Sequence, residues 1–354
     1  MGRNRWVSVI LLALIAAGAI VAQNTVPAQT PPPAKPEVSA SQDAFRTGVS
    51  EVIVPVTVTD QKGRFVTDLE QKDFKIFDEG KEQTISYFTR ERNQPVVIGF
   101  LVDLSNASRL HWAKFLDAIQ ELISATMPEP DRFSGYLIGY SNEAELLVNT
   151  TSDPEKLIEK TRKMKPGGGA ALYDAIYMAC TSRTLVKGEP IEPRRVIVIV
   201  GDGHDSASKR GLDEVLELAQ RNLVTIYGVS TVAFGFNSEG EKPLNKLAES
   251  TGGRVVFPLQ NVYSDVSGYL STPSDEGNYA IKVGTGGYAA ALMRGIVNAI
   301  GATAGEITTQ YILRYVPSDV DVNRQYRRIR VEVNLANVKV RAREGYYPFA
   351  PPNQ

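Results

Sequence analysis

The sequence predicts an α/β fold: a Rossmann-like, doubly wound and mostly parallel sheet, inserted into a β-sandwich-like domain that both terminal segments build. Continuous apolar runs such as "PVVIGFLVD" and "RRVIVIVGDG" are typical of strands buried on both faces. Helical patterns alternate with these runs, which favours a parallel sheet with helices on both faces. Near both ends of the chain, apolar and polar residues alternate instead, as in half-buried antiparallel strands.

The two terminal β segments are each too short to bury an apolar face alone. In "EVIVPVTVTD" the valines fall on one side of a strand, and "DFKIFDEGKEQTISYF" predicts two strands around a turn at residues 78–80. The segments "TQYILRYVP", "RRIRVEVNL" and "VKVRAREGYY" show the same alternation near the C-terminus. We therefore expect the two segments to form one sandwich around the central α/β region.

The central region shows helical spacing of its apolar residues between the predicted strands. Helices are predicted over residues 110–126, 154–164, 171–184, 212–222, 243–250 and 289–302. Residues 262–288 are rich in Gly, Ser and Tyr without a clear period, which predicts a loop insertion before the last helix.

The N-terminus has the features of an export signal. Arg3 and Arg5 precede an apolar run that ends at the small residue Ala22, so a signal peptide is predicted over residues 1–22. The run is shorter than the ~20 apolar residues of a membrane span, and an uncleaved anchor is the alternative. We expect an exported protein, periplasmic or extracellular, that contacts the membrane only if this anchor is retained.

A Pro-rich disordered linker is predicted after the signal, over residues 23–46. The predicted organisation then has three parts. They are the N-terminal part of the sandwich at 47–92, the α/β domain at 93–306 and the C-terminal part of the sandwich at 307–348.

Composition excludes some classes of function. The formal net charge of −1 over 354 residues gives no basis for nucleic-acid binding. Cys180 is the single cysteine, so no intramolecular disulfide forms, and we interpret it as a small apolar residue on a helix.

Two carboxylates are predicted to meet at the edge of the parallel sheet. For the strand order 3-2-1-4-5-6, the order reverses between the first strand, residues 96–102, and the fourth, residues 196–200. Asp103 ends the first strand in "GFLVDLSNASRL", and Asp202 follows the fourth in "GDGHD". Two carboxylates with hydroxyl neighbours are the type of ligand that a hard cation such as Mg²⁺ prefers.

The order of these motifs resembles the von Willebrand factor type A domain. More closely, the chain resembles the von Willebrand type A-related proteins of Acidobacteria. The matching stretches are "VTVTDQKGRFVTDLEQKDFKIFDEGKEQTISYF", "GGGAALYDAI", "LAESTGGRVVFPL", "QYILRYVP" and "YRRIRVEVN" with "VKVRAREGYY". The resemblance implies an exported binding protein. It also implies a metal-ion-dependent adhesion site, made from Asp-x-Ser-x-Ser, a distant Thr and a distant Asp.

The first motif of that site is incomplete. Asp103 and Ser105 match, but Ala107 stands where the second serine belongs, and Ser108 comes one place late. An offset of one residue at a turn is expected to aim the Ser108 side chain elsewhere. We expect Ser105 or Ser108 to serve mainly as a helix cap.

The distant threonine is also missing, because Ala170 occupies its place in "GGGAALYDAI". Asp202 matches the distant aspartate. Three side-chain ligands therefore remain, Asp103, Ser105 and Asp202, and the site is predicted to be degenerate. No cofactor is firmly predicted, and any binding of Mg²⁺ or Mn²⁺ is expected to be weak or absent.

The predicted function is that of a non-enzymatic adhesion or scaffold module that binds a protein or glycan ligand. Its contact surface would lie at the same edge of the sheet, with Asn106, Ser108, Ala170 and His204 as partner-binding residues.

Two other functions remain open. The first is a structural component of a cell-envelope complex, which would not use the crevice between Asp103 and Asp202 for binding. A serine hydrolase would use Ser105 or Ser206 with His204 and Asp205. The hydrolase is disfavoured, because the one candidate base, His204, lies next to Asp205 and two residues from Asp202 in sequence. No nucleophile-elbow motif is present either.

Overall fold

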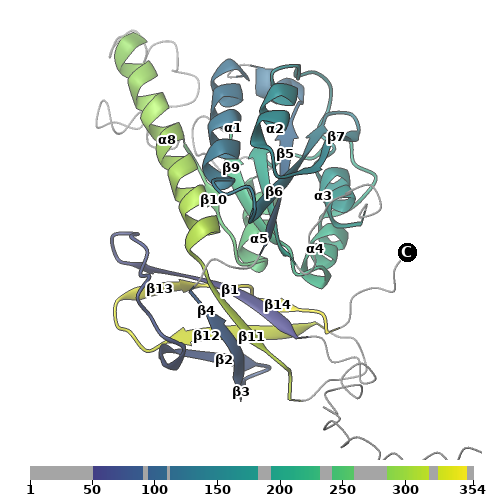
Figure 1. Cartoon of the computed structure of the whole chain (residues 1–354). Helices are drawn as coiled ribbons and strands as arrows, with labels where there is room; N and C mark the ends of the chain where they lie inside the picture. Colours follow the sequence, from purple (N-terminus) through teal and green to yellow (C-terminus); the bar gives the residue numbers. More distant parts are fainter. Residues whose placement is uncertain are drawn as a thin grey trace, which may run out of the picture. The chain divides into compact units, whose positions relative to one another are not determined.

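The apolar runs of the central region form a six-stranded sheet, hereafter the central sheet, in the order β10-β9-β8-β5-β6-β7 (Figure 1). The computed structural model describes residues 51–90, 95–109, 112–181, 193–231, 241–258, 285–318 and 326–348. The strands are β5 (Val96–Asp103), β6 (Phe133–Tyr140), β7 (Ala144–Thr151), β8 (Arg194–Gly201), β9 (Thr225–Ser230) and β10 (Val255–Val256). All pair in parallel except β7, which is antiparallel to β6. The predicted order 3-2-1-4-5-6 is therefore confirmed.

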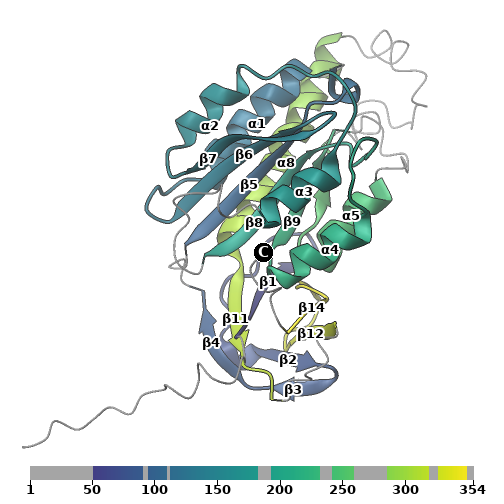
Figure 2. The ribbon, with the colours of Figure 1, turned by 90° about the vertical axis from the view of Figure 1, so that its right-hand side faces the viewer.

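Helices cover both faces of the central sheet, as the alternation of the sequence predicts (Figure 2). One face packs against α1 (Trp112–Thr126), α2 (Pro154–Thr161) and α8 (Thr285–Thr309). The other packs against α3 (Leu172–Thr181), α4 (Leu212–Arg221) and α5 (Glu241–Ser250). Within the described ranges, none of the helices has the length and hydropathy needed to cross a membrane.

The last helix is longer than the sequence predicts. The helix α8 begins at Thr285 and ends at Thr309, whereas the sequence predicts a helix over residues 289–302. Residues 285–288 of the expected loop are therefore helical, and residues 262–284 lie outside the described residues. The expected domain boundary at 306/307 falls inside the last turn of α8.

The terminal segments form two four-stranded antiparallel sheets with one shared core, hereafter the β-sandwich. Their orders are β13-β1-β11-β4 and β14-β12-β2-β3. The N-terminal strands are β1 (Val52–Asp60), β2 (Phe74–Asp78), β3 (Lys81–Gln83) and β4 (Ile85–Thr89). The C-terminal strands are β11 (Tyr311–Tyr315), β12 (Arg327–Val333), β13 (Val338–Arg341) and β14 (Gly345–Tyr346). Both sheets mix strands from both ends of the chain, so the inserted arrangement is confirmed.

One detail of the N-terminal segment differs from the prediction. The sequence predicts two strands over residues 73–88, but the structure has three there, β2, β3 and β4. The chain leaves the sheet of β2 and β3 at Thr84 and joins the other sheet as β4. The partners differ accordingly: Gln83 pairs with Ile76, and Ile85 pairs with Tyr315.

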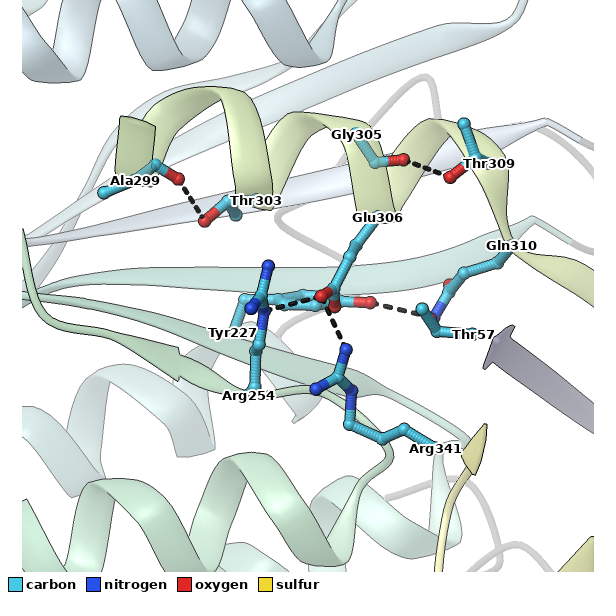
Figure 3. Close-up of polar contacts among 10 residues, drawn as sticks. All are labelled: Thr57, Tyr227, Arg254, Ala299, Thr303, Gly305, Glu306, Thr309, Gln310 and Arg341. Atoms are coloured by element: carbon cyan, nitrogen blue, oxygen red, sulfur yellow. Dashed lines mark hydrogen bonds and ion pairs between the residues drawn. The ribbon is translucent and has the colours of Figure 1, made fainter. Parts of the chain in front are cut away.

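A polar junction joins α8 to the β-sandwich (Figure 3). The Gln310 side-chain amide donates hydrogen bonds to Thr57 Oγ1 at 3.0 Å and to Tyr227 Oη at 2.9 Å. One turn earlier, the fully buried Glu306 carboxylate contacts Arg254 and Arg341, each at 2.5 Å. These contacts tie α8 at once to the central sheet and to the sandwich.

The signal peptide and linker predicted over residues 1–46 lie outside the described residues. All described residues belong to the unit Thr47–Gln354.

Candidate functional site

The strand-end site lies where β5 and β8, neighbours in the central sheet, reach their carboxyl ends. Asp103 is the last residue of β5, and Asp202 follows the last residue of β8. Chain connections leave these two strands for opposite sides of the sheet, which is where ligands bind in open α/β sheets. The structure therefore brings together the two carboxylates that the sequence predicts at this edge.

The Asp103 carboxylate is held in a buried position. Its side chain is 2% exposed, and Oδ1 accepts a hydrogen bond from the Ser105 backbone N–H at 2.7 Å. Burial raises the pKa of Asp103, and the neighbouring Asp202 charge acts in the same direction, while the Ser105 N–H opposes both. A buried carboxylate beside a second one is a position that a bound cation would stabilise.

Asp202 is more accessible. It is half-buried, and its Oδ1 accepts a hydrogen bond from the His204 backbone N–H at 2.9 Å. Gly203 between them has φ +80°, a conformation that favours glycine and turns the chain back over the carboxylate. The imidazole of His204 is exposed.

The two serine hydroxyls are not helix caps, which corrects that expectation. Ser105 Oγ and Ser108 Oγ are buried, and neither forms a hydrogen bond of regular geometry with the described residues. The local capping interaction is the Asp103 carboxylate with the Ser105 N–H. The first turn after β5 is a 3-10 helix over Asn106–Arg109, and α1 spans Trp112–Thr126.

The Ser108 side chain lies at the site, whereas its offset of one residue from the motif predicts that it points elsewhere. It is 7% exposed and lies close enough to the Asp103 carboxylate to lower its pKa, whereas Ala107 is exposed. The 3-10 turn explains this, since its side chains repeat every three residues rather than every 3.6. Ser105 and Ser108 therefore share a face of the turn, and Ala107 lies on another.

Ala170 lies in the loop before α3 and is buried. Its N–H donates to Ser206 Oγ at 3.0 Å, and its carbonyl accepts from the Ser206 N–H at 2.8 Å. A second contact fixes the same loop, because Asn106 N–H donates to Gly168 O at 3.0 Å. The loop is positioned at the site, but the Ala170 methyl group offers it no oxygen.

The residues of the alternative hydrolase do not form a catalytic arrangement. Asp205 Oδ1 accepts hydrogen bonds from the Tyr173 N–H at the start of α3 and from Ser208 Oγ. Ser206 Oγ is engaged by the Ala170 N–H. In the part of the chain that the structure describes, no hydrogen bond links the His204 imidazole to Asp205 or to either serine.

The donors present at the strand-end site fit a hard divalent cation. Asp103 and Asp202 supply carboxylate oxygens, and Ser105 and Ser108 supply buried hydroxyl oxygens that lack other partners. Oxygen-only donors suit Mg²⁺ or Mn²⁺. No group of three or more His, Cys, Asp or Glu side chains with metal-binding geometry occurs among the described residues, so any ion would depend on hydroxyls and water.

Two further residues of this site were not predicted. Tyr140 ends β6 and pairs in register with Asp103, and Gly201 ends β8. In sequence, Tyr140 is only the end of an apolar strand and Gly201 one of 29 glycines. Neither residue can be recognised as part of the site before the register of the strands is known.

One known protein family matches the α/β region of the chain. Residues 98–267 match the family model of the von Willebrand factor type A domain. No curated protein sequence matches the chain significantly.

Many solved structures resemble this region in fold. The VWA domain of SpRpn10 is 18% identical over 46% of this chain and 87% of its own, with a TM-score of 0.36. Proximal thread matrix protein 1 from the mussel byssus, with a zinc-occupied MIDAS motif, is 17% identical over 48% of this chain and 42% of its own, with a TM-score of 0.39. BatB from Bacteroides thetaiotaomicron is 19% identical over 55% of this chain and 99% of its own, with a TM-score of 0.36.

These structural likenesses concern the fold alone. The strand order with its single antiparallel edge, the helices on both faces and the family match agree on one assignment. Residues 98–267 form a von Willebrand factor type A domain.

Proposed function

We propose that this protein is an exported, non-enzymatic interaction module of the adhesion or scaffold type, which binds a protein or glycan through the strand-end site. The observation that carries the proposal is the pairing of a buried carboxylate, Asp103, with an exposed rim of Asn106 and His204 at the edge of a von Willebrand factor type A domain. Ser108 and Ala170 form the floor of this surface.

The cation site is proposed to be degenerate and weak. Mg²⁺ requires near-octahedral oxygen coordination and keeps its waters. The protein lacks hydroxyls at Ala107 and Ala170, so water would fill more of the shell than in a complete motif. We expect dissociation constants for Mg²⁺ and Mn²⁺ above the micromolar range by calorimetry. A stoichiometric micromolar site that Asp103→Ala abolishes would contradict this.

Partner capture tests the contact surface. The full chain, immobilised, is exposed to an extract of the cell envelope beside a variant with Asp103→Ala and Asp202→Ala, and captured species are identified by mass spectrometry. Species that bind the wild type and not the variant support the proposal. Unchanged capture favours the second candidate, a structural envelope component with an unused crevice. A Lys246→Ala variant is the control, since Lys246 pairs with Asp213 on an exposed surface.

The export proposal rests on residues 1–22. If the apolar run is retained as an anchor, the linker of residues 23–46 would hold the folded part away from the membrane. We also propose that the protein is related to the von Willebrand type A-related proteins of Acidobacteria. Mass spectrometry of the native protein is expected to find an N-terminus near residue 23. Recovery of the intact N-terminus would indicate a retained membrane anchor instead.

A further inference from the structure

Two buried hydroxyls adjoin the Asp103 carboxylate outside the positions of the motif. They belong to Tyr140, which is 1% exposed, and Ser108, which is 7% exposed. Tyr140 Oη has no hydrogen-bond partner among the described residues, and Ser108 Oγ forms none of regular geometry there, although it lies close enough to the Asp103 carboxylate to lower its pKa. Buried polar groups are nearly always satisfied, so each calls for a physical explanation.

Tyr140 is aimed into the site by the sheet itself. It pairs in register with Asp103 on the neighbouring parallel strand, so both side chains lie on the same face. A Cβ placed at Gly201 would lie 2.4 Å from Tyr140 Oη, 2.8 Å from Asp103 Cβ and 3.4 Å from Asp103 Oδ2. The phenol oxygen and the carboxylate therefore flank the same point, and they approach there because residue 201 has no side chain.

Ser108 lies near the same carboxylate from a position shortly after Asp103 in the chain. The 3-10 turn Asn106–Arg109 places it beside Ser105 rather than in the place of Ala107. The Ser108 N–H donates to the Ser105 carbonyl at 3.3 Å, which holds the turn closed. Its hydroxyl oxygen thus lies inside the site although its sequence position is outside the motif.

We propose that Ser108 and Tyr140 belong to the cation site of Asp103 and Asp202: Ser108 supplies the oxygen that Ala107 lacks, and Tyr140 is a positioning residue that donates its hydroxyl proton to the carboxylate or water oxygens around the ion. The place of Ala170 is left to water, so the site remains weak. The proposal rests on the proposed cation site, and it explains why the two hydroxyls are buried without a regular hydrogen bond to the described residues. The ion class is a hard divalent cation of the Mg²⁺ or Mn²⁺ type.

The test measures Mn²⁺ binding to the full chain by electron paramagnetic resonance of the free ion, in wild type, Ser108→Ala and Tyr140→Phe. Each substitution removes one hydroxyl and little volume. We expect each to weaken Mn²⁺ binding by about ten- to a hundredfold, the range for residues that support a metal ligand shell. The Mn²⁺-induced rise in melting temperature should shrink in parallel, because it reports the same affinity.

Two matched control variants show whether a change in Mn²⁺ affinity is specific to the site or follows from removing any buried hydroxyl. Tyr136→Phe changes a tyrosine four residues earlier in β6, whose hydroxyl lies against Gly99. Ser134→Ala removes another buried, unpartnered serine hydroxyl at the start of β6. Both should leave the Mn²⁺ affinity within about twofold of wild type, since distant sites act independently.

Two outcomes overturn the inference: affinities unchanged in both site variants, or wild type that binds no Mn²⁺ at millimolar concentration. The melting temperature without metal shows whether each variant is folded, and a loss of affinity counts only in a folded variant. If a variant unfolds, Ser108→Gly or Tyr140→Leu replaces it. Partner capture reports separately on the proposed function, because capture that is independent of Asp103 contradicts that function and leaves the Mn²⁺ result standing.

Discussion

Glu306 of α8 and Arg341 of β13 form an ion pair at 2.5 Å whose carboxylate is fully buried (Figure 3). Arg254, which directly precedes β10, contacts the same Glu306 oxygen at 2.5 Å. One buried charge thus connects the last helix, the edge of the central sheet and the sandwich. The two guanidinium groups share the carboxylate and are each about one-third exposed.

Arg341→Met should destabilise the protein, because it leaves the buried Glu306 charge with one partner. We expect a loss of up to about 3 kcal/mol, the low end for breaking a buried ion pair, since Arg254 remains. Denaturant unfolding measures it. Arg64→Met is the control, because Arg64 pairs with Asp60 while 75% exposed, and its effect should stay within about 0.5 kcal/mol. Equal effects of the two variants would contradict the role of the junction.

The stability deficit of Arg341→Met should grow with pH. Burial raises the pKa of Glu306 above its usual 4.5, and the two arginines oppose this. Removing Arg341 raises the folded-state pKa further. Below pH 4.5 the carboxyl is protonated in both folded and unfolded chains, but as pH rises the unfolded chain ionises first, so stability falls until the folded pKa is passed. Melting temperatures at pH 4 and pH 7 should therefore differ more in the variant than in wild type. A deficit that is constant over this range would refute the assignment.

Gly201→Ala should disturb the strand-end site. Its Cβ would lie 2.4 Å from Tyr140 Oη and 2.8 Å from Asp103 Cβ. Overpacking of this kind costs about 1–3 kcal/mol. Adding Tyr140→Phe removes the closer contact and should restore part of the loss, measured as a double-mutant cycle. Additive effects of the two substitutions would show that the side chains do not meet at residue 201.

Ala107→Ser and Ala170→Thr together should strengthen cation binding, mainly through residue 170. Ala170→Thr reintroduces the threonine oxygen of the motif in the loop at the site, whereas the exposed residue 107 lies on another face of the turn. Calorimetry with Mg²⁺ should show a lower dissociation constant than wild type. Ala207→Ser is the control, because it adds a hydroxyl to the loop after β8 without completing a motif position. Because Ser108 already occupies the site, Ala107→Ser alone should contribute less than Ala170→Thr. A larger effect of Ala107→Ser would argue against the placement of Ser108.

Deleting residues 309–354 should unfold the N-terminal β segment. Strand β11 pairs with both β1 and β4, and β12 pairs with β2. Without them the valines of β1 lose the facing half of their core. Hydrogen exchange should show loss of protection over Val52–Asp60 and Ile85–Thr89. Deleting only residues 349–354 is the control, and retained protection in the longer deletion would refute the discontinuous sandwich.

Local patterns in the sequence determined most of the fold. The doubly buried strands β5 and β8 are predictable because parallel strands are apolar throughout, and β1 because one face alternates. The order of the central sheet follows from connection rules, so the meeting of Asp103 and Asp202 was predictable as well. The three strands in residues 73–88 were not, because the exchange of sheets at Thr84 depends on partners more than 200 residues away.

Only the tertiary structure decided what surrounds the two carboxylates. The position of Ser108 depends on a 3-10 turn, whose three-residue repeat differs from the spacing that a motif in sequence presupposes. The proximity of Tyr140 depends on its register with Asp103 and on the missing side chain at Gly201, which lies 61 positions further along the chain. The polar junction at Glu306 likewise joins residues from three elements. Sequence patterns report which residues share a face of one element, whereas the neighbours across elements follow from strand register and close packing, which the whole chain determines together.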